Sequence, residues 1–224
     1  MNGTNRAHSP RVGRLISGLL IAMFGVAAEV DAQTLVTAPV SGTSGMFQDT
    51  IGYSFTVGSS SLRVTALSVY DSLGDGLLSS NTVGVWTNSG TLVSSVTFSA
   101  GTGAPLVDHF RSLSVTPFDL VSGQTYRIGA FSLYGEDRYS GYVPNGQFAV
   151  TGDVTLVGGV RSSNYTTFAF PSDAPAAGWA VIGPNLEYSA IPEPATSVLL
   201  AGAAALGVAL LRRKIGRQTR PTVG

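Results

Sequence analysis

Alternation of apolar and polar residues dominates the middle of the chain and predicts β-strands. In the run Gly52–Val57, the side chains of Tyr53, Phe55 and Val57 fall on one face, because successive strand residues point to opposite sides. The run Leu62–Tyr70 divides into two predicted faces: Leu62, Val64, Ala66 and Ser68 on one, and Arg63, Thr65, Leu67 and Val69 on the other. Further runs of the same kind follow at Thr82–Trp86, Thr91–Phe98, Phe110–Thr116, Thr125–Leu133, Gln147–Val157 and Trp179–Ser189.

Turn residues separate these runs and set the expected fold class. Gly, Asn, Ser and Asp lie between the runs, and the stretch "TNSG" after Trp86 is typical of a hairpin turn. About eight short strands without a long helical pattern predict an all-β domain, an antiparallel β-sandwich or jelly roll, over residues 33–190. Trp86 and Trp179 lie within strand patterns and are expected in the core. Three prolines are candidates for protecting strand edges: Pro117, Pro144 and Pro171.

The first 32 residues have the pattern of a secretory signal peptide. Arginines precede the apolar run Leu15–Ala28, which is too short to span a bilayer comfortably. Val30 and Ala32 are small enough for the subsites of signal peptidase, so we expect a signal helix in residues 1–32 and cleavage between Ala32 and Gln33. The alternative is an uncleaved N-terminal anchor.

A second apolar run lies near the C-terminus. Ala195–Leu211 has 17 residues without a charge, which as a helix cover about 25 Å, the lower limit for a transmembrane span. Arg212, Arg213 and Lys214 follow, and would keep residues 215–224 as a basic cytoplasmic tail. Small residues dominate the run, so it is a weak permanent anchor. A soluble core helix is disfavoured because the run is apolar on every face.

The order of features at this end resembles a known bacterial signal. Pro192-Glu193-Pro194, a short span rich in small residues and the basic Arg212-Arg213-Lys214 are similar to the PEP-CTERM sorting signal of Gram-negative bacteria. The resemblance covers residues 191–214; the tail "IGRQTRPTVG" continues further than such signals usually do. It implies recognition by an exosortase, a membrane-embedded transpeptidase, with processing near Pro192-Glu193-Pro194. The protein would sit in the inner membrane transiently and then reach the cell surface or extracellular matrix.

Charge and cysteine content restrict the function classes. Between Gln33 and Ala190 five arginines stand against ten acidic residues, so no basic patch exists for nucleic acid. The chain has no cysteine, which excludes disulfides, thiol catalysis and Cys-type zinc sites. A domain of this size can be stabilised by its core alone.

Part of the β-domain resembles the DUF4082-like extracellular β-domains. The matching units are Asp75-Gly76-Leu77, Val83-Gly84-Val85-Trp86, Gly90-Thr91-Leu92 and Leu120 to Ala130, including Tyr126-Arg127-Ile128-Gly129-Ala130. The resemblance covers roughly Ser54 to Ala130 and the last strand. It implies a β-sandwich module attached to surface or carbohydrate-active proteins, with no established activity of its own.

Two stretches raise the question of catalysis or metal binding. The loop Tyr70–Asn81 carries Asp71 and Asp75 among glycines, which suits either a Ca²⁺ site or a plain turn. His109 is the single histidine after residue 32; Asp108 beside it would point to the opposite side of a strand, so we expect a surface histidine. For a glycoside hydrolase, the candidate carboxylates are Asp71, Asp75, Glu136 and Asp137, although adjacent residues rarely flank one bond.

Carbohydrate binding is the sharper alternative. The stretch Leu133–Gly146 collects Tyr134, Tyr139 and Tyr142 with polar residues, and flat aromatic faces pack on sugar C–H surfaces. The same tyrosines would equally cover the end of the sandwich or pack beneath a long loop. We therefore expect a non-catalytic structural or adhesive protein, exported by signal peptidase and exosortase processing and suited to a biofilm matrix. The alternative is a carbohydrate-binding module for matrix exopolysaccharide. No cofactor is expected beyond the Ca²⁺ considered above.

Overall fold

The described part of the protein is built almost entirely of β-strands. The computed structural model describes residues 32–37, 44–46, 48–132, 138–144, 149–177, 179–192 and 202–208. All strand pairs in these residues are antiparallel. The prediction of an all-β chain is confirmed at this level. The predicted signal helix lies outside the described residues.

A five-stranded sheet joins the two ends of the β-domain. Its order is β1 (Gln33–Thr34), β16 (Pro184–Ala190), β5 (Leu62–Tyr70), β9 (Phe110–Leu120) and β8 (Leu106–Val107). The first of the described strands therefore pairs with the last of them. β8 pairs only with Phe110 and Arg111 at the start of β9, and Pro117 lies in the later part of β9 without a paired residue on β5. The missing N–H of proline therefore removes no hydrogen bond between strands. Its placement agrees with the expected role at an edge.

A six-stranded sheet forms the other large layer. Its order is β14 (Asp173–Ala177), β13 (Val154–Arg161), β4 (Ile51–Val57), β10 (Thr125–Ser132), β6 (Asn81–Thr87) and β7 (Leu92–Phe98). The predicted hairpin at "TNSG" is confirmed, because β6 pairs with β7 and the Gly90 N–H donates to the Thr87 carbonyl at 3.0 Å.

Two small sheets complete the described strands. One has the order β15 (Trp179–Ile182), β11 (Arg138–Pro144) and β3 (Ser44–Met46), and the other pairs β12 (Ala149–Val150) with β2 (Val36–Thr37). The single strand predicted over Gln147–Val157 was wrong. Gly152 has φ of 70° and ends the pairing of β12 before β13 begins, because a positive φ turns the chain out of the extended conformation.

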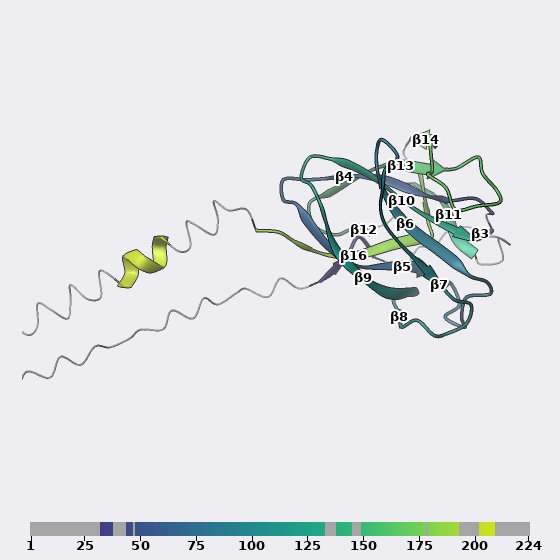
Figure 1. The fold of residues 1–224 in the computed structure, drawn as a ribbon, viewed down its shortest axis with the longest axis horizontal. Coiled ribbons are helices and arrows are strands. Elements are labelled where there is room, and N and C mark those ends of the chain that lie inside the picture. The colour runs from purple at the N-terminus through teal and green to yellow at the C-terminus, as the bar shows by residue number, and fades with distance from the viewer. Residues whose placement is uncertain are drawn as a thin grey trace, which may run out of the picture.

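One hydrophobic cluster is shared by both large sheets. Tyr53, Phe55 and Val57 of β4 are fully buried in it, as their alternation predicts. Leu67 of β5 and Leu186 of β16 join them from the five-stranded sheet. Figure 1 shows the strands of both sheets gathered in one body. A β-sandwich or jelly roll with one core remains the prediction for how these layers are arranged.

A bulge corrects the predicted faces of β5. The register of β5 against β16 shifts between Val64 and Ala66, because Thr65 is an extra residue opposite the consecutive Glu187 and Tyr188. An extra residue in one strand moves the following side chains to the other face. As a result Val64 and then Leu67 and Val69 enter the same core cluster. Strict alternation over Leu62–Tyr70 had placed Val64 opposite the other two. The alternation holds on each side of the bulge but not across it.

The outer face of the six-stranded sheet carries two paired glycines, Gly129 of β10 and Gly84 of β6. A Cβ at either would meet Trp86 and a residue of the segment 162–172. A Cβ at Gly84 would lie 2.4 Å from Cζ of Phe168. The Phe168 ring can therefore pack at this position only because residue 84 has no side chain. The centroids of the Phe168 and Trp86 rings are 4.9 Å apart. Residues 162–172, which follow β13, thus pack along this face.

This packing changes the place of Trp86. The residue is 3% exposed, as expected for a buried tryptophan, but it is covered by Phe168 and Phe170 rather than by the main core cluster. The prediction that Trp86 is a core residue is therefore confirmed by its burial, with Phe168 and Phe170 as its aromatic neighbours. The side chain of Trp179 lies outside the described residues.

At the C-terminal end, a short helix covers residues 202–208, inside the predicted span 195–211. Among the residues that the structure describes, no helix is long and apolar enough to cross a membrane.

Candidate functional site

Both predicted processing points lie at one end of the β-domain. Gln33 pairs with Tyr188, and the Ile191 N–H donates to the Ser61 carbonyl at 2.7 Å. Ala32, before β1, and Pro192, after β16, are both exposed. In Figure 1 the purple β1 and the yellow-green end of β16 leave the body on the same side. We call this the sorting end of the domain.

The remaining sorting residues are not covered by the structure. Glu193, Pro194, Arg212, Arg213 and Lys214 lie outside the described residues. The structure does describe the residues before them: β16 ends at Ala190 in a hydrogen-bonded pairing, and Pro192 is exposed.

One of the three tyrosines proposed for sugar binding is a core residue. Tyr139 is fully buried, its hydroxyl donates to Oδ1 of Asn81, and its ring lies against the backbone of Gly183, where a Cβ would be 2.6 Å from Cγ of the ring. A ring without exposed surface cannot stack on a sugar, so Tyr139 as a binding residue was wrong. Tyr134 and the side chain of Tyr142 lie outside the described residues.

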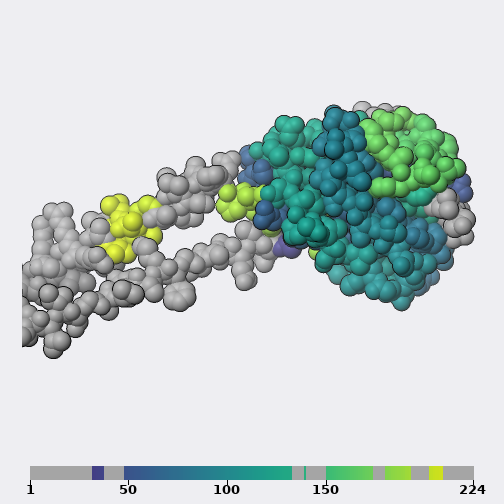
Figure 2. All heavy atoms as spheres, in the orientation of Figure 1, coloured from purple at the N-terminus to yellow at the C-terminus, as the bar shows by residue number. Residues whose placement is uncertain are grey.

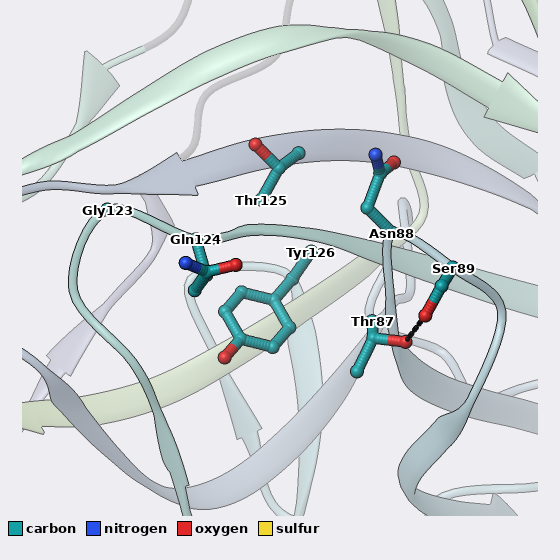
Figure 3. Close-up of a pocket in the computed structure, with 7 residues that line it drawn as sticks. All are labelled: Thr87, Asn88, Ser89, Gly123, Gln124, Thr125 and Tyr126. Atoms are coloured by element: carbon teal, nitrogen blue, oxygen red, sulfur yellow. Dashed lines mark hydrogen bonds between the residues drawn. The ribbon is translucent and has the colours of Figure 1, made fainter.

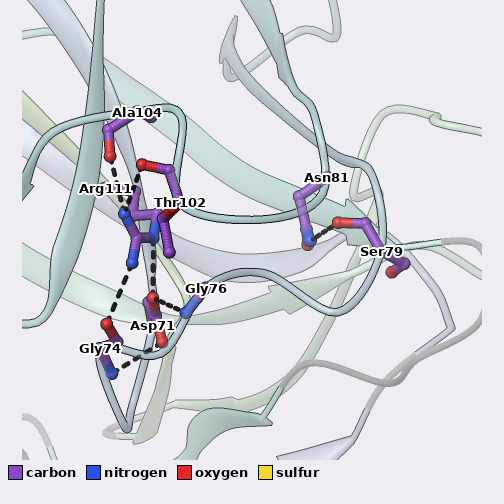
Figure 4. A network of polar contacts seen from close by, with 8 residues as sticks. All are labelled: Asp71, Gly74, Gly76, Ser79, Asn81, Thr102, Ala104 and Arg111. Carbon is purple, nitrogen blue, oxygen red and sulfur yellow. Dashed lines mark hydrogen bonds and ion pairs between the residues drawn. The ribbon is translucent and has the colours of Figure 1, made fainter.

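The loop that carries Asp71 is organised by an arginine from another strand. Nε of Arg111, on β9, lies 2.7 Å from Oδ2 of Asp71, and each side chain is 4% exposed. Backbone N–H groups of Gly74 and Gly76 donate to the same carboxylate at 2.9 and 3.0 Å. Figure 4 shows the Asp71 carboxylate enclosed by these three donors.

The guanidinium of Arg111 is satisfied on its other nitrogens as well. Nη1 donates to the carbonyls of Thr102 and Ala104 at 3.2 and 2.8 Å, and Nη2 donates to that of Gly74 at 3.1 Å. These contacts tie the Asp71 loop to residues 102–104 (Figure 4). A buried charge needs such partners, because each polar atom has lost its water.

This network bears on the Ca²⁺ hypothesis for Asp71 and Asp75. The lone pairs of Asp71 already accept from Arg111 and two amides, while Asp75 is exposed. In the described ranges no group of three or more His, Cys, Asp or Glu side chains is placed to hold a metal ion. The geometry gives the Ca²⁺ reading of this loop no support, and the plain-turn alternative fits what is seen.

His109 lies in a tight turn rather than in a strand. Asp108 and His109 have φ of 47° and 66°, so the expectation that a strand directs them to opposite sides was wrong. The exposed His109 ring has its centroid 6.2 Å from that of Tyr70. Its carbonyl accepts from the Asp71 N–H at 2.8 Å. The residue is on the surface, as expected.

Several other carboxylates are engaged in links between strands and loops. Ser59 donates from its backbone and its hydroxyl to Asp153, and this hydrogen bonding from Ser59 lowers the pKa of that carboxyl. The hydrogen bond from Arg63 does the same for the pKa of Asp119. Ser112 donates to Glu187 at 2.5 Å. The proposed hydrolase residues Glu136 and Asp137 lie outside the described residues.

A polar hollow of about 530 Å³ lies near the sorting end. It is lined by Thr87, Asn88, Ser89, Gly123, Gln124, Thr125 and Tyr126 (Figure 3). Much of its polarity is already used. The hydroxyls of Thr87 and Ser89 bond each other at 2.9 Å, and the Tyr126 hydroxyl accepts from the Val121 N–H at 2.9 Å. These pairs leave a small number of groups for a ligand.

A second hollow, of about 610 Å³, lies in the segment that covers Trp86. We call it the Tyr165 hollow; it is lined by Ser162, Ser163, Asn164, Tyr165, Thr166, Ala169, Phe170 and Ser172. Tyr165 is 53% exposed. Figure 2 shows this bright green part of the chain at the surface of the molecule. Aromatic and hydroxyl-bearing side chains therefore meet at one accessible place.

Sequence reasoning missed both the arginine network and the Tyr165 hollow. Arg111 lies 40 residues from Asp71, and the local sequence around either residue does not predict that the two form an ion pair. The run "SSNYTTF" carried a local signal, an Asn whose side chain caps a turn beside an aromatic residue. In the sequence, the tyrosines at 134–142 form a larger aromatic cluster than the single Tyr165 does.

The comparisons with known proteins identify the C-terminal region. The family model of the PEP-CTERM protein-sorting motif matches residues 190–214. This match supports a PEP-CTERM protein, and with it a protein that is exported and sorted by an exosortase. No curated protein and no solved structure matches the chain significantly.

Proposed function

We propose that this PEP-CTERM protein has a non-catalytic, structural or adhesive role at the cell surface or in the extracellular matrix. The observation that carries the proposal is the sorting motif directly after β16. A signal of this kind addresses the β-domain to the exterior. The domain is then the part that remains to act there, and we infer that residues 33–190 are its working unit.

The geometry of the sorting end supports display of this domain. Because β1 pairs with β16, the predicted mature start and the sorting motif lie at the same end. Loops at the other end of the strands, among them the Asp71 loop, then face away from any attachment at residues 190–214. A protein held in this way presents its loops and sheet faces to other molecules.

The described charged residues support a role without catalysis. Asp71, Asp119 and Glu187 each accept a hydrogen bond that links two strands or a strand and a loop. General acid–base catalysis needs a group free to exchange a proton with a bound substrate. Carboxylates committed to such links serve the fold instead. A glycoside hydrolase, the less favoured alternative, would leave new reducing ends on a matrix polymer.

The proposal is tested by measuring how firmly cells of the native host attach to a surface. A strain lacking the gene should detach from a surface at lower shear than its parent, and the full-length gene should restore attachment. A chain truncated after Ala190 should not restore it, because it lacks the sorting motif. Unchanged attachment in the deletion strain would contradict the structural or adhesive role.

A carbohydrate-binding module for matrix polysaccharide is the second candidate. The Tyr165 hollow favours it, because it combines an exposed aromatic ring with hydroxyl and amide groups, the usual composition of a site for a polar ligand. Whether adhesion proceeds through such binding is a separate question from whether the protein is adhesive.

A further inference from the structure

We propose that the Tyr165 hollow binds a segment of a neutral polysaccharide, with the exposed face of Tyr165 as the platform on which a sugar ring packs. This inference rests on the proposed adhesive function and gives it a ligand class and a site. It is a site distinct from the tyrosines at 134–142, of which Tyr139 has no exposed surface.

Tyr165 is held in place by the residues beneath it. The guanidinium carbon of Arg161 lies 5.9 Å from the centroid of the Tyr165 ring, and Nε of Arg161 lies 2.7 Å from Oδ2 of the buried Asp49. A cation above one face of the ring leaves the other face for a ligand. A platform fixed before binding loses little conformational entropy when the ligand arrives.

The turn around Asn164 is fixed by its own side chain. Oδ1 of Asn164 accepts from the backbone N–H groups of Thr166 and Thr167 at 3.0 and 3.1 Å. Its Nδ2 donates to the hydroxyl of Thr167 at 2.7 Å. This arrangement fixes the turn that carries Tyr165, whose side chain is 53% exposed.

The opposite wall of the hollow is anchored to the sheet. Nη1 of Arg127, on β10, donates to the carbonyls of Pro171 and Ser172 at 2.6 and 2.7 Å. The same guanidinium lies 5.0 Å from the centroid of Phe170. The Ala169 N–H donates to the Thr50 hydroxyl at 3.0 Å. Both walls are therefore fixed independently of any ligand.

The chemistry of the lining points to a neutral, hydroxyl-rich ligand. The lining residues carry no ionisable acid or base other than the tyrosine phenol. The hydroxyls of Ser163, Thr166 and Ser172 donate within residues 163–173 and keep acceptor lone pairs for a ligand. At the rim, Asp173 accepts from the hydroxyls of Ser163 and Ser172 at 2.5 and 3.1 Å. Its remaining lone pairs can accept from sugar hydroxyls. The volume lies within the roughly 300–1,000 Å³ typical of ligand sites.

Binding of the full-length chain, purified in detergent, tests this proposal. The probes are an array of neutral and uronic-acid oligosaccharides and the polysaccharide extracted from the matrix of the native host. Wild-type protein should bind neutral sugars saturably. Tyr165→Ala should weaken this binding by about tenfold or more, whereas Tyr165→Phe should retain it, because the ring face rather than the hydroxyl is the platform.

Val121→Ala is the matched control, since Val121 is also 53% exposed and lies on the turn between β9 and β10. It should bind like wild type. The melting midpoint of Tyr165→Ala should equal that of wild type, which separates lost binding from lost folding. Wild-type affinity in Tyr165→Ala would overturn the site while leaving the adhesive role intact. No binding to any neutral probe, or binding to uronic acids alone, would overturn the ligand class; the shear experiment judges the adhesive role independently.

Discussion

Two loops of the domain are fixed by internal hydrogen bonds but differ in what they expose. The Asp71 loop is rich in Gly, Ser and Asp, whereas the segment 162–172 combines Ser, Thr and Asn with aromatic residues. In the first, the Asp71 carboxylate and the Arg111 guanidinium are 4% exposed and bond to each other and to the backbone. In the second, the anchors Arg127 and Arg161 lie beneath or beside the segment, and Tyr165 faces solvent.

The comparison shows how a loop that only stabilises the fold differs from a loop that can also bind a ligand. A loop whose polar atoms satisfy each other stabilises the fold and offers little to a ligand. In the segment 162–172 the polar side chains also bond within the segment or to Asp173, but Tyr165 is left 53% exposed and available for recognition. Both loops are fixed by internal hydrogen bonds, and what distinguishes them is the exposure of an aromatic ring in the second.

The largest expected effect is at Arg111. Arg111→Ala leaves the Asp71 carboxylate buried without its partner and should lower the free energy of unfolding by about 3–5 kcal/mol. Arg63→Ala is the matched control, because Arg63 and Asp119 form an exposed pair with side chains 55% and 44% exposed. Chemical denaturation measures both variants. Equal midpoints for the two would show that burial does not distinguish these pairs.

A smaller loss of stability is expected from a side chain at Gly84, beneath the segment 162–172. Gly84→Ala places a methyl group 2.4 Å from Cζ of Phe168, so the ring must move away from the sheet at a cost of about 1–3 kcal/mol. Gly103→Ala is the control, since a Cβ there meets nothing within 4 Å. Thermal melting compares them. A Gly84→Ala variant as stable as Gly103→Ala would mean that the segment is not packed on this face as described.

The rim of the Tyr165 hollow should respond to pH. Hydrogen bonds from Ser163 and then Ser172 lower the pKa of Asp173 below its ordinary value of 3.8. A carboxyl with a lowered pKa in the folded state contributes stability above that ordinary value, and the contribution is lost as the pH falls through the lowered pKa. Asp173→Asn should therefore melt earlier than wild type at neutral pH, with the difference vanishing in strong acid. A difference independent of pH would contradict this cause.

The smallest effect is expected from metal at the Asp71 loop. Because Asp71 already accepts from Arg111, Gly74 and Gly76, excess Ca²⁺ or a chelator should leave the melting midpoint unchanged. A ligand that binds the folded state raises that midpoint. A rise with Ca²⁺ that Asp75→Asn abolishes would restore the calcium hypothesis.

The sequence predicts the strands better than it predicts the contacts between them. Period-two alternation places Tyr53, Phe55 and Val57 in the core because it is a local property of one strand. The bulge after Val64 is defined by the pairing of β5 with β16, so alternation alone misplaces Leu67 and Val69. The regular period of a strand pattern does not reveal where an extra residue enters the ladder.

The candidate sites were harder to predict for the same reason. The sorting motif is contiguous, so Pro192-Glu193-Pro194 and the basic cluster can be read directly along the chain. The Tyr165 hollow combines residues 162–172 with Arg127 and Arg161, which meet only after the sheet has formed. Tyr139 shows the converse: an attractive residue in the sequence is placed under Gly183 by β11 and β15.

Mass spectrometry of the mature protein from its native host tests the central claim most directly. If the chain is exported and sorted through its PEP-CTERM motif at residues 190–214, the mature form should begin at Gln33 and lack the residues after Leu211. A mature chain that retains residues beyond Leu211 would contradict the account and make the C-terminal run a permanent anchor.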